Sequence, residues 1–180
     1  MKIEEMTQEI EFPQEVQASV ENNILQCKGP KGELSREFRS KKIIVTVQDG
    51  LVKLVAHNAT KREKTLMNTF RAHVRNMVIG VTTGHHYTLK ICSGHFPMNV
   101  TLKGNEFTVK NFLGEKVPRT TIIKDGAKVK IEGEIVTVDG IDIEIVGQCT
   151  ANIEQLTRIT SKDRRIFQDG IWITSKPGKL

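Results

Sequence analysis

The chain has 180 residues, of which 38% are hydrophobic, so it can bury a substantial core, and its formal net charge is +6. No apolar run approaches the roughly 18 to 20 residues that cross a membrane, and the acidic N-terminus lacks the apolar segment of a secretory signal. Three scattered cysteines, Cys27, Cys92 and Cys149, form no even disulfide framework and are typical of a reducing compartment.

The first half of the chain predicts short strands followed by one helix. Alternating or β-branched runs indicate strands over 16–20, 23–28, 43–47 and 51–55. Gly29-Pro30-Lys31-Gly32 predicts a turn, because glycine permits positive φ and proline fixes its own. Asp49-Gly50 predicts a hairpin turn between two of the strands. Apolar residues at helical spacing then predict a helix over 65–78, with Gly80 as its stop.

The second half repeats this plan after a bend at Gly84-His85-His86. The expected strands are 87–91, 99–102, 106–110, 120–124, 129–132 and 135–138. A helix is expected over 141–159, although 141–145 also alternates like a strand and Gly147 weakens a helix. Asp169-Gly170 then predicts a turn before the short apolar run 171–173.

Two segments of the chain recur at a nearly constant offset. The stretch 28–36 reappears at 110–119, 82 to 83 positions later, and the apolar residues of 45–54 correspond to those of 129–138 at an offset of 84. A period of this length indicates a duplicated small domain and not a solenoid. The predicted fold class is therefore α+β, with two tandem duplicated lobes, each a small, mostly antiparallel sheet packed on one helix. The lobes are expected at 1–81 and 82–180, the second with a basic C-terminal extension.

No local pattern predicts catalysis, and we expect no enzyme activity. Gly29-Pro30-Lys31-Gly32 lies between strands, which is the wrong context for holding a nucleotide phosphate. Cys92-Ser93-Gly94-His95, near His85 and His86, is the strongest candidate for a metal site. Structural zinc needs four ligands in paired spacing, however. We therefore expect no metal or cofactor and interpret Cys92 as a small core residue.

Basic residues cluster at predicted turns, Lys28 and Lys31 among them, and toward the C-terminus. Six basic and two acidic residues lie between Arg158 and Leu180, which gives +4 of the total +6. A solvated charged tail accounts for this pattern, and so does a polyanion contact, because cations that neutralise phosphates supply most sequence-independent nucleic-acid affinity. Aromatic content of 5% argues against a single-strand stacking platform and favours recognition of folded RNA. For Trp172 we expect first that it anchors the tail to its own lobe, and second that it contacts a base or a partner.

Segments spread in order along nearly the whole chain resemble one family, the large-subunit ribosomal proteins called L-six in bacteria and L-nine in eukaryotes. The segments are Gly29–Leu34, Phe70–Met77, Gly80–Thr82, His95–Met98, Val109–Lys116, Val146–Gln148, Ala151–Gln155 and Asp169–Ile173. The His95-Phe96-Pro97 segment and the ending before Ile173 resemble the archaeal and eukaryotic branch more than the bacterial one.

The resemblance implies a duplicated, non-enzymatic fold that is a structural constituent of the large subunit in the cytosolic ribosome. It implies rRNA binding near the factor-binding region, at the stalk base and beside the sarcin–ricin loop, with ribosomal proteins and translation factors as neighbours and no membrane. In the family the C-terminal lobe makes the principal rRNA contacts. The candidate rRNA-binding residues are Lys110, Lys116, Arg119, Arg158, Lys162, Arg164, Arg165, Trp172, Lys176 and Lys179.

A second interpretation from the residues stays open. Exposed edge strands or basic loops would also suit a protein–protein interaction module that docks an acidic ribosomal or translation-factor partner.

Overall fold

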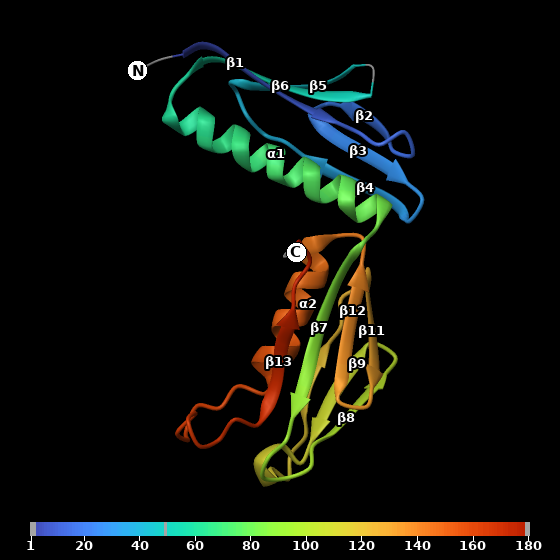
Figure 1. The fold of residues 1–180 in the computed structure, drawn as a ribbon, viewed down its shortest axis with the longest axis vertical. Coiled ribbons are helices and arrows are strands. Elements are labelled where there is room, and N and C mark those ends of the chain that lie inside the picture. Colours follow the sequence, from blue (N-terminus) through green and yellow to red (C-terminus); the bar gives the residue numbers. More distant parts are fainter. Residues whose placement is uncertain (1–2, 49, 179–180) are drawn as a thin grey trace. The chain divides into compact units, whose positions relative to one another are not determined.

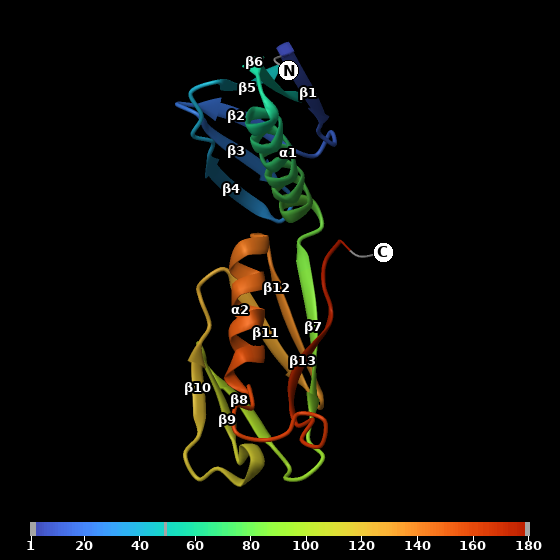
Figure 2. The same cartoon turned by 90° about the vertical axis from the view of Figure 1, so that its left-hand side faces the viewer.

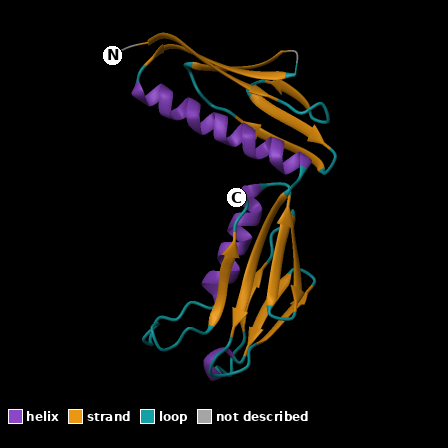
Figure 3. Cartoon of the chain, in the orientation of Figure 1, coloured by secondary structure: helices purple, strands orange, loops and turns teal. Residues whose placement is uncertain are grey.

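The computed structural model of the protein describes residues 3–48 and 50–178 (Figure 1). The chain divides into two units, Met1–Gly84 and His85–Leu180. Each unit contains antiparallel strands and one long α-helix (Figure 3), which confirms the predicted α+β class with tandem lobes. Of the helices that the structure describes, neither is both long enough and apolar enough to span a membrane.

The first unit arranges its strands in two three-stranded sheets. One sheet has the order β1-β6-β5, built from β1 (Ile3–Glu11), β6 (Leu51–Ala59) and β5 (Ile43–Gln48). The other has the order β2-β3-β4, built from β2 (Gln17–Glu21), β3 (Ile24–Gly29) and β4 (Gly32–Glu37). Both sheets pack on α1 (Lys61–Thr82), and their inward residues, such as Leu25 and Leu54, are fully buried.

A capping box sets the start of α1. The Thr60 hydroxyl accepts a hydrogen bond from the Arg62 N–H, and the Glu63 carboxylate accepts one from the Thr60 N–H at 2.9 Å. The helix is therefore longer at its start than the predicted 65–78. It also continues past the predicted stop, which was wrong, because Gly80 is a buried helical residue.

The second unit has a four-stranded and a three-stranded sheet beside α2 (Ile143–Leu156), as Figure 2 shows. The four-stranded sheet has the order β11-β12-β7-β13, built from β11 (Ala127–Glu132), β12 (Ile135–Gly140), β7 (His85–Cys92) and β13 (Gly170–Ser175). The three-stranded sheet has the order β10-β9-β8, built from β10 (Arg119–Ile122), β9 (Glu106–Lys110) and β8 (Asn99–Lys103). A short 3-10 turn, η1 (Phe112–Gly114), follows β9.

The start of α2 resolves the ambiguity at 141–145. The Asp142 carboxylate accepts a hydrogen bond from the Glu144 N–H at 2.8 Å and caps the helix. The segment is therefore helical from Ile143 onward. Val146, Cys149 and Ile153 form the buried stripe of the helix, which packs into the core of the second unit.

The internal repeat corresponds to paired strands. In the β5–β6 hairpin Val45 pairs with Leu54 and Val47 with Val52, and in the β11–β12 hairpin Val129 pairs with Val138 and Ile131 with Val136. The same offset thus relates both the residues and their cross-strand partners. Asp49 of the predicted hairpin turn lies outside the described residues, but Gln48 pairs with Leu51 on either side of it.

The two units differ at one strand. β7 pairs with β12 on one side and β13 on the other, whereas β1, its counterpart, lies at the edge of its sheet. The additional strand comes after a segment between α2 and β13 that carries four of the ten candidate site residues.

Candidate nucleic-acid interface

The segment between α2 and β13 gathers four of the predicted cations. We call residues 158–169 the cationic loop. Its basic side chains, Arg158, Lys162, Arg164 and Arg165, are all exposed. The loop therefore presents four exposed cations to which a polyanion could bind.

A buried carboxylate fixes the end of the cationic loop. Asp169 accepts hydrogen bonds from the Gly94 N–H at 2.6 Å and the His95 N–H at 3.0 Å, and its other oxygen lies 2.6 Å from His95 Nδ1. Burial alone would raise the pKa of Asp169, but these hydrogen bonds outweigh it, so the pKa is lowered. The ionised carboxylate ties the loop to the segment that comes after β7.

Side-chain contacts order the loop itself. The Phe167 ring stacks on His95 with centroids 4.7 Å apart, and the Lys162 ammonium lies 4.8 Å from the Phe167 centroid. Arg165 forms an ion pair with Asp163 at 2.8 Å, and the Arg165 side chain is 90% exposed. An ion pair this exposed contributes little stability, so a phosphate can replace Asp163 as the partner of Arg165 at small cost.

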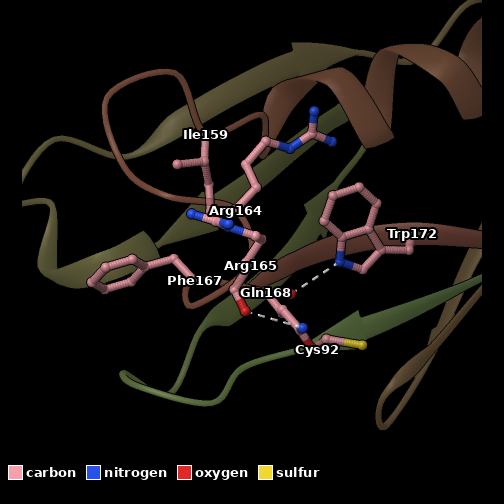
Figure 4. Close-up of a pocket in the computed structure, with 7 residues that line it drawn as sticks. All are labelled: Cys92, Ile159, Arg164, Arg165, Phe167, Gln168 and Trp172. Atoms are coloured by element: carbon pink, nitrogen blue, oxygen red, sulfur yellow. Dashed lines mark hydrogen bonds between the residues drawn. The ribbon is translucent and has the colours of Figure 1, made fainter.

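Trp172, Arg164 and Arg165 line one cavity of about 540 Å³ (Figure 4), which we call the Trp172 cavity. Its other lining residues are Cys92, Ile159, Phe167 and Gln168. The indole N–H of Trp172 donates to the Gln168 carbonyl at 3.2 Å, which attaches β13 to the cationic loop. A second cavity of about 280 Å³ shares Ile159, Arg164 and Trp172 with the first and adds Arg158. The structure thus brings Arg158, Arg164, Arg165 and Trp172 together.

Arg119 is engaged within the protein. Its Nε and Nη2 donate to Glu115 at 2.8 and 2.6 Å, and its Nη1 donates to the carbonyls of Leu156 at 2.8 Å and Arg158 at 3.2 Å. The guanidinium also lies 4.5 Å from the Phe112 ring centroid. These contacts satisfy carbonyls at the end of α2, whose last turn has no basic residue of its own. We infer that Arg119 positions the start of the cationic loop.

The remaining candidate lysines lie away from this cluster. Lys110 is exposed at the end of β9, Lys116 in the next loop and Lys176 just after β13. These three, all in the described part of the chain, line neither cavity that contains Trp172. Lys179 lies outside the described residues.

The first copy of the repeated basic motif has an intramolecular role. Gly29-Pro30-Lys31-Gly32 forms the predicted turn between β3 and β4. The Lys31 N–H donates to the Val81 carbonyl at 3.0 Å, and the Lys31 ammonium donates to the Thr83 carbonyl. A Cβ at Gly29 would lie 2.7 Å from the Val81 oxygen. The turn therefore packs on the end of α1, and only glycine permits this approach.

The residues considered for a metal site have other positions. His86 Nδ1 lies 2.6 Å from Asp139, His95 is bound to Asp169 and His85 is buried. Within residues 3–48 and 50–178, no three His, Cys, Asp or Glu side chains are grouped to hold a metal ion. Cys92 is half-buried and lines the Trp172 cavity, so its interpretation as a core residue was wrong.

Sequence reasoning missed the residues that fix the site. Asp169 was interpreted only as a turn residue, and its partners at Gly94 and His95 are 75 and 74 positions away. Phe167 begins the ending that resembles the archaeal and eukaryotic branch, but its stacking on His95 was not predicted. The family resemblance was the one signal in the sequence for His95 and Asp169, because both residues lie in segments that resemble the family.

Comparison with known proteins gives two agreeing results. The family model described as "Ribosomal protein L6" matches residues 12–84 and again 96–170, once in each unit. The large ribosomal subunit protein uL6 of Natronomonas pharaonis is 41% identical over 174 residues, covering 97% of this chain and 98% of that protein. The protein of the same name from Archaeoglobus fulgidus is 42% identical over 173 residues, covering 93% and 88%.

Proposed function

Because the chain belongs to the ribosomal protein L6 family, we propose that its second unit binds large-subunit rRNA through the cationic loop. As a member of this family, the protein is a structural constituent of the large ribosomal subunit and not an enzyme. The proposed location is near the factor-binding region, at the stalk base and beside the sarcin–ricin loop. Ribosomal proteins of the stalk base and translation factors are the proposed neighbours, in a cytosolic ribosome.

One observation carries this proposal: Arg158, Arg164 and Arg165 line two adjoining cavities with Trp172, in a loop that is already ordered. Asp169 and Trp172 hold the loop from its C-terminal end, and Arg119 holds the Arg158 carbonyl at its start. An ordered loop loses little conformational entropy when it binds. Each phosphate contact then adds affinity through counterion release. Guanidinium groups suit phosphate because they can donate two parallel hydrogen bonds.

The edge at β13 gives little support to strand addition by a protein partner. The Ile171 N–H donates to the Thr157 hydroxyl at 2.9 Å, and the Ile173 N–H donates to the Glu154 carboxylate at 3.0 Å. These two donors are therefore satisfied by α2 and its C-cap and are not offered to another strand. The observation favours the RNA proposal over docking of an acidic protein at this edge.

Salt-dependent binding to deproteinised large-subunit rRNA tests the proposal. The variant R158Q/R164Q/R165Q should bind more weakly, and its slope of log K against log salt should fall by about 2, since each phosphate contact contributes roughly 0.7 to 0.9. The matched control K103Q/K128Q/K130Q removes three exposed lysines from strands of the same unit. A triple variant that keeps the wild-type slope, or a control that loses as much, contradicts the proposed interface.

A crosslinking map of the protein on the assembled subunit tests the location separately. Crosslinks from Arg158–Gln168 should fall in the sarcin–ricin loop and the stalk base. Crosslinks from the same residues to distant rRNA would overturn the location even if the salt test succeeds.

A further inference from the structure

We infer that the Trp172 cavity is a subsite for one unpaired nucleotide of the bound RNA. The base would lie against the indole, and the flanking phosphates would meet Arg164 and Arg165. The inference rests on the proposed function, because it names the RNA element that the cationic loop recognises.

The cavity combines the two surfaces that a nucleotide needs. Cys92, Ile159 and the aromatic rings form an apolar part, and two guanidinium groups stand beside it (Figure 4). Its volume of about 540 Å³ falls within the range of roughly 300 to 1,000 Å³ typical of small-molecule sites. The Gln168 side chain also lines the cavity. Its amide nitrogen donates to the Arg165 carbonyl at 3.4 Å, which leaves its second N–H and its oxygen for the edge of a base.

Trp172 is the ring that is placed to stack. Phe167 already contacts His95 and Lys162, so its faces are occupied. The Trp172 ring is held at its edge by the bond to the Gln168 carbonyl, and it lies over Gly170, where a Cβ would come 3.2 Å from ring atoms. The same ring lines both cavities. A ring that is fixed before binding loses little freedom when a base stacks on it.

The cations are spaced along both cavities. Arg165 lines the first cavity, Arg158 the second and Arg164 both. A chain that passes one base into the first cavity would therefore have Arg164 and Arg165 beside that base and Arg158 in the adjoining cavity. This arrangement follows a backbone and does not merely attract a single anion.

The aromatic ring favours RNA over an acidic peptide. Carboxylates would pair with the arginines but would leave the indole without a stacking partner, whereas every base has a π-face. Bases in a duplex are already stacked on their neighbours, so only an unpaired nucleotide can enter. One ring serves one base, in agreement with the low aromatic content of the chain.

Two native side chains can be used to measure ligand binding in the Trp172 cavity. Trp172 is the one tryptophan of the sequence, so its emission monitors this site alone. Cys92 is half-buried in the cavity lining, whereas Cys27 and Cys149 are buried. Burial raises the pKa of Cys27 to about 11 and also raises the pKa of Cys149. Because the thiolate is the reactive form, iodoacetamide at neutral pH should modify Cys92 in preference to the other two.

The test uses the full chain and a six-nucleotide single-stranded oligoadenylate. We expect saturable quenching of Trp172 emission and a slower alkylation of Cys92 over the same concentration range. N-acetyltryptophanamide at equal absorbance corrects for light absorbed by the RNA. W172F should retain protection of Cys92, and W172L should bind about 5- to 150-fold more weakly, the range that base–aromatic stacking supplies. R164Q/R165Q should also weaken binding, whereas K128Q/K130Q should not.

Other ligands distinguish the alternatives. Equal protection of Cys92 by tripolyphosphate would overturn the base subsite and leave a phosphate site. Equal protection by hexaglutamate would overturn it in favour of an acidic protein. If oligoadenylate neither quenches Trp172 nor protects Cys92 while rRNA binding keeps its salt slope, the subsite is refuted and the proposed function stands; if rRNA binding is also absent, both fall. Circular dichroism of W172L checks its fold, and the wild-type thiol measurement decides the question without that variant.

Discussion

The two units complete their helices in the same way but continue from there differently. Neither α1 nor α2 has a basic residue in its last turn, and in both units a cation from elsewhere in the unit binds a carbonyl at the helix end. The cation is Lys31 in the first unit and Arg119 in the second. A cation at this place compensates the partial negative charge of the helix end.

The units diverge in the chain beyond the helix. After α1 the first unit ends at Gly84, whereas after α2 the chain forms the cationic loop and then β13. Arg119 accordingly binds a carbonyl beyond the helix end, that of Arg158. Similar local charge therefore has two uses in this protein. Charge in the repeated motif stabilises the fold, and charge in the added segment is available to RNA.

Replacing Gly29 by valine should disrupt the first unit, with the largest effect. A Cβ at this position would lie 2.7 Å from the Val81 oxygen and 2.9 Å from its side chain, and the backbone cannot move away without opening the turn from α1. We expect a loss of about 3 kcal/mol in the free energy of unfolding, at the upper end of overpacking costs. Urea denaturation followed by circular dichroism measures it.

Gly94→Ala is the matched control in the other unit. There the nearest atom to a new Cβ is an Asp169 oxygen at 4.0 Å, which leaves room for a methyl group. Gly94→Ala should keep wild-type stability to within about 0.5 kcal/mol. Equal losses in the two variants would mean that the contact of Gly29 with α1 is not what the residue provides.

Removing the two cations that bind carbonyls at the helix ends should affect the units unequally. Arg119→Met should cost about 1.5 to 3 kcal/mol, because it removes charge-assisted bonds to Glu115 and to two carbonyls of a half-buried site. Lys31→Met should cost only about 0.3 to 1 kcal/mol, the usual worth of an exposed cation at a helix end. Chemical denaturation of both variants checks the order.

Binding to rRNA separates a positioning role of Arg119 from a direct contact. A misplaced cationic loop should lower the affinity of Arg119→Met while its salt slope remains that of the wild type, because no phosphate contact is lost. A slope that falls by about one would instead assign Arg119 to the interface.

Much of the fold was predictable because its signals are local. The β5–β6 hairpin combines a turn dipeptide with two β-branched runs, and the internal repeat then indicated its counterpart β11–β12. The strands β1 and β4 were missed, since their sequences alternate polar and weakly apolar residues, and β1 pairs with β6 about 50 positions later. The predicted start of α1 at residue 65 was wrong, although Thr60 and Glu63 have the spacing of a capping box in the sequence.

The candidate site was predictable in its charge but not in its contacts. Composition alone points to the cations between Arg158 and Lys176. That Lys31 and Arg119 bind carbonyls 52, 37 and 39 positions away is a property of the tertiary structure. Basic residues in two copies of one motif therefore looked like ligand contacts, because a sequence shows charge and does not show what neutralises it.

Acid should weaken the N-terminal cap of α1, with the smallest effect. Hydrogen bonds from the Thr60 hydroxyl and N–H, and then from Lys42, lower the pKa of Glu63 to about 2. A lowered folded-state pKa stabilises the protein above the unfolded-state value, about 4.3, and this contribution is lost as the pH falls through the folded-state pKa. Between about pH 5 and pH 2 the stability of wild-type protein should therefore fall more than that of Glu63→Gln. Thermal melts of both at stepped pH measure the difference, and parallel curves would mean that Glu63 titrates alike in the folded and unfolded chain.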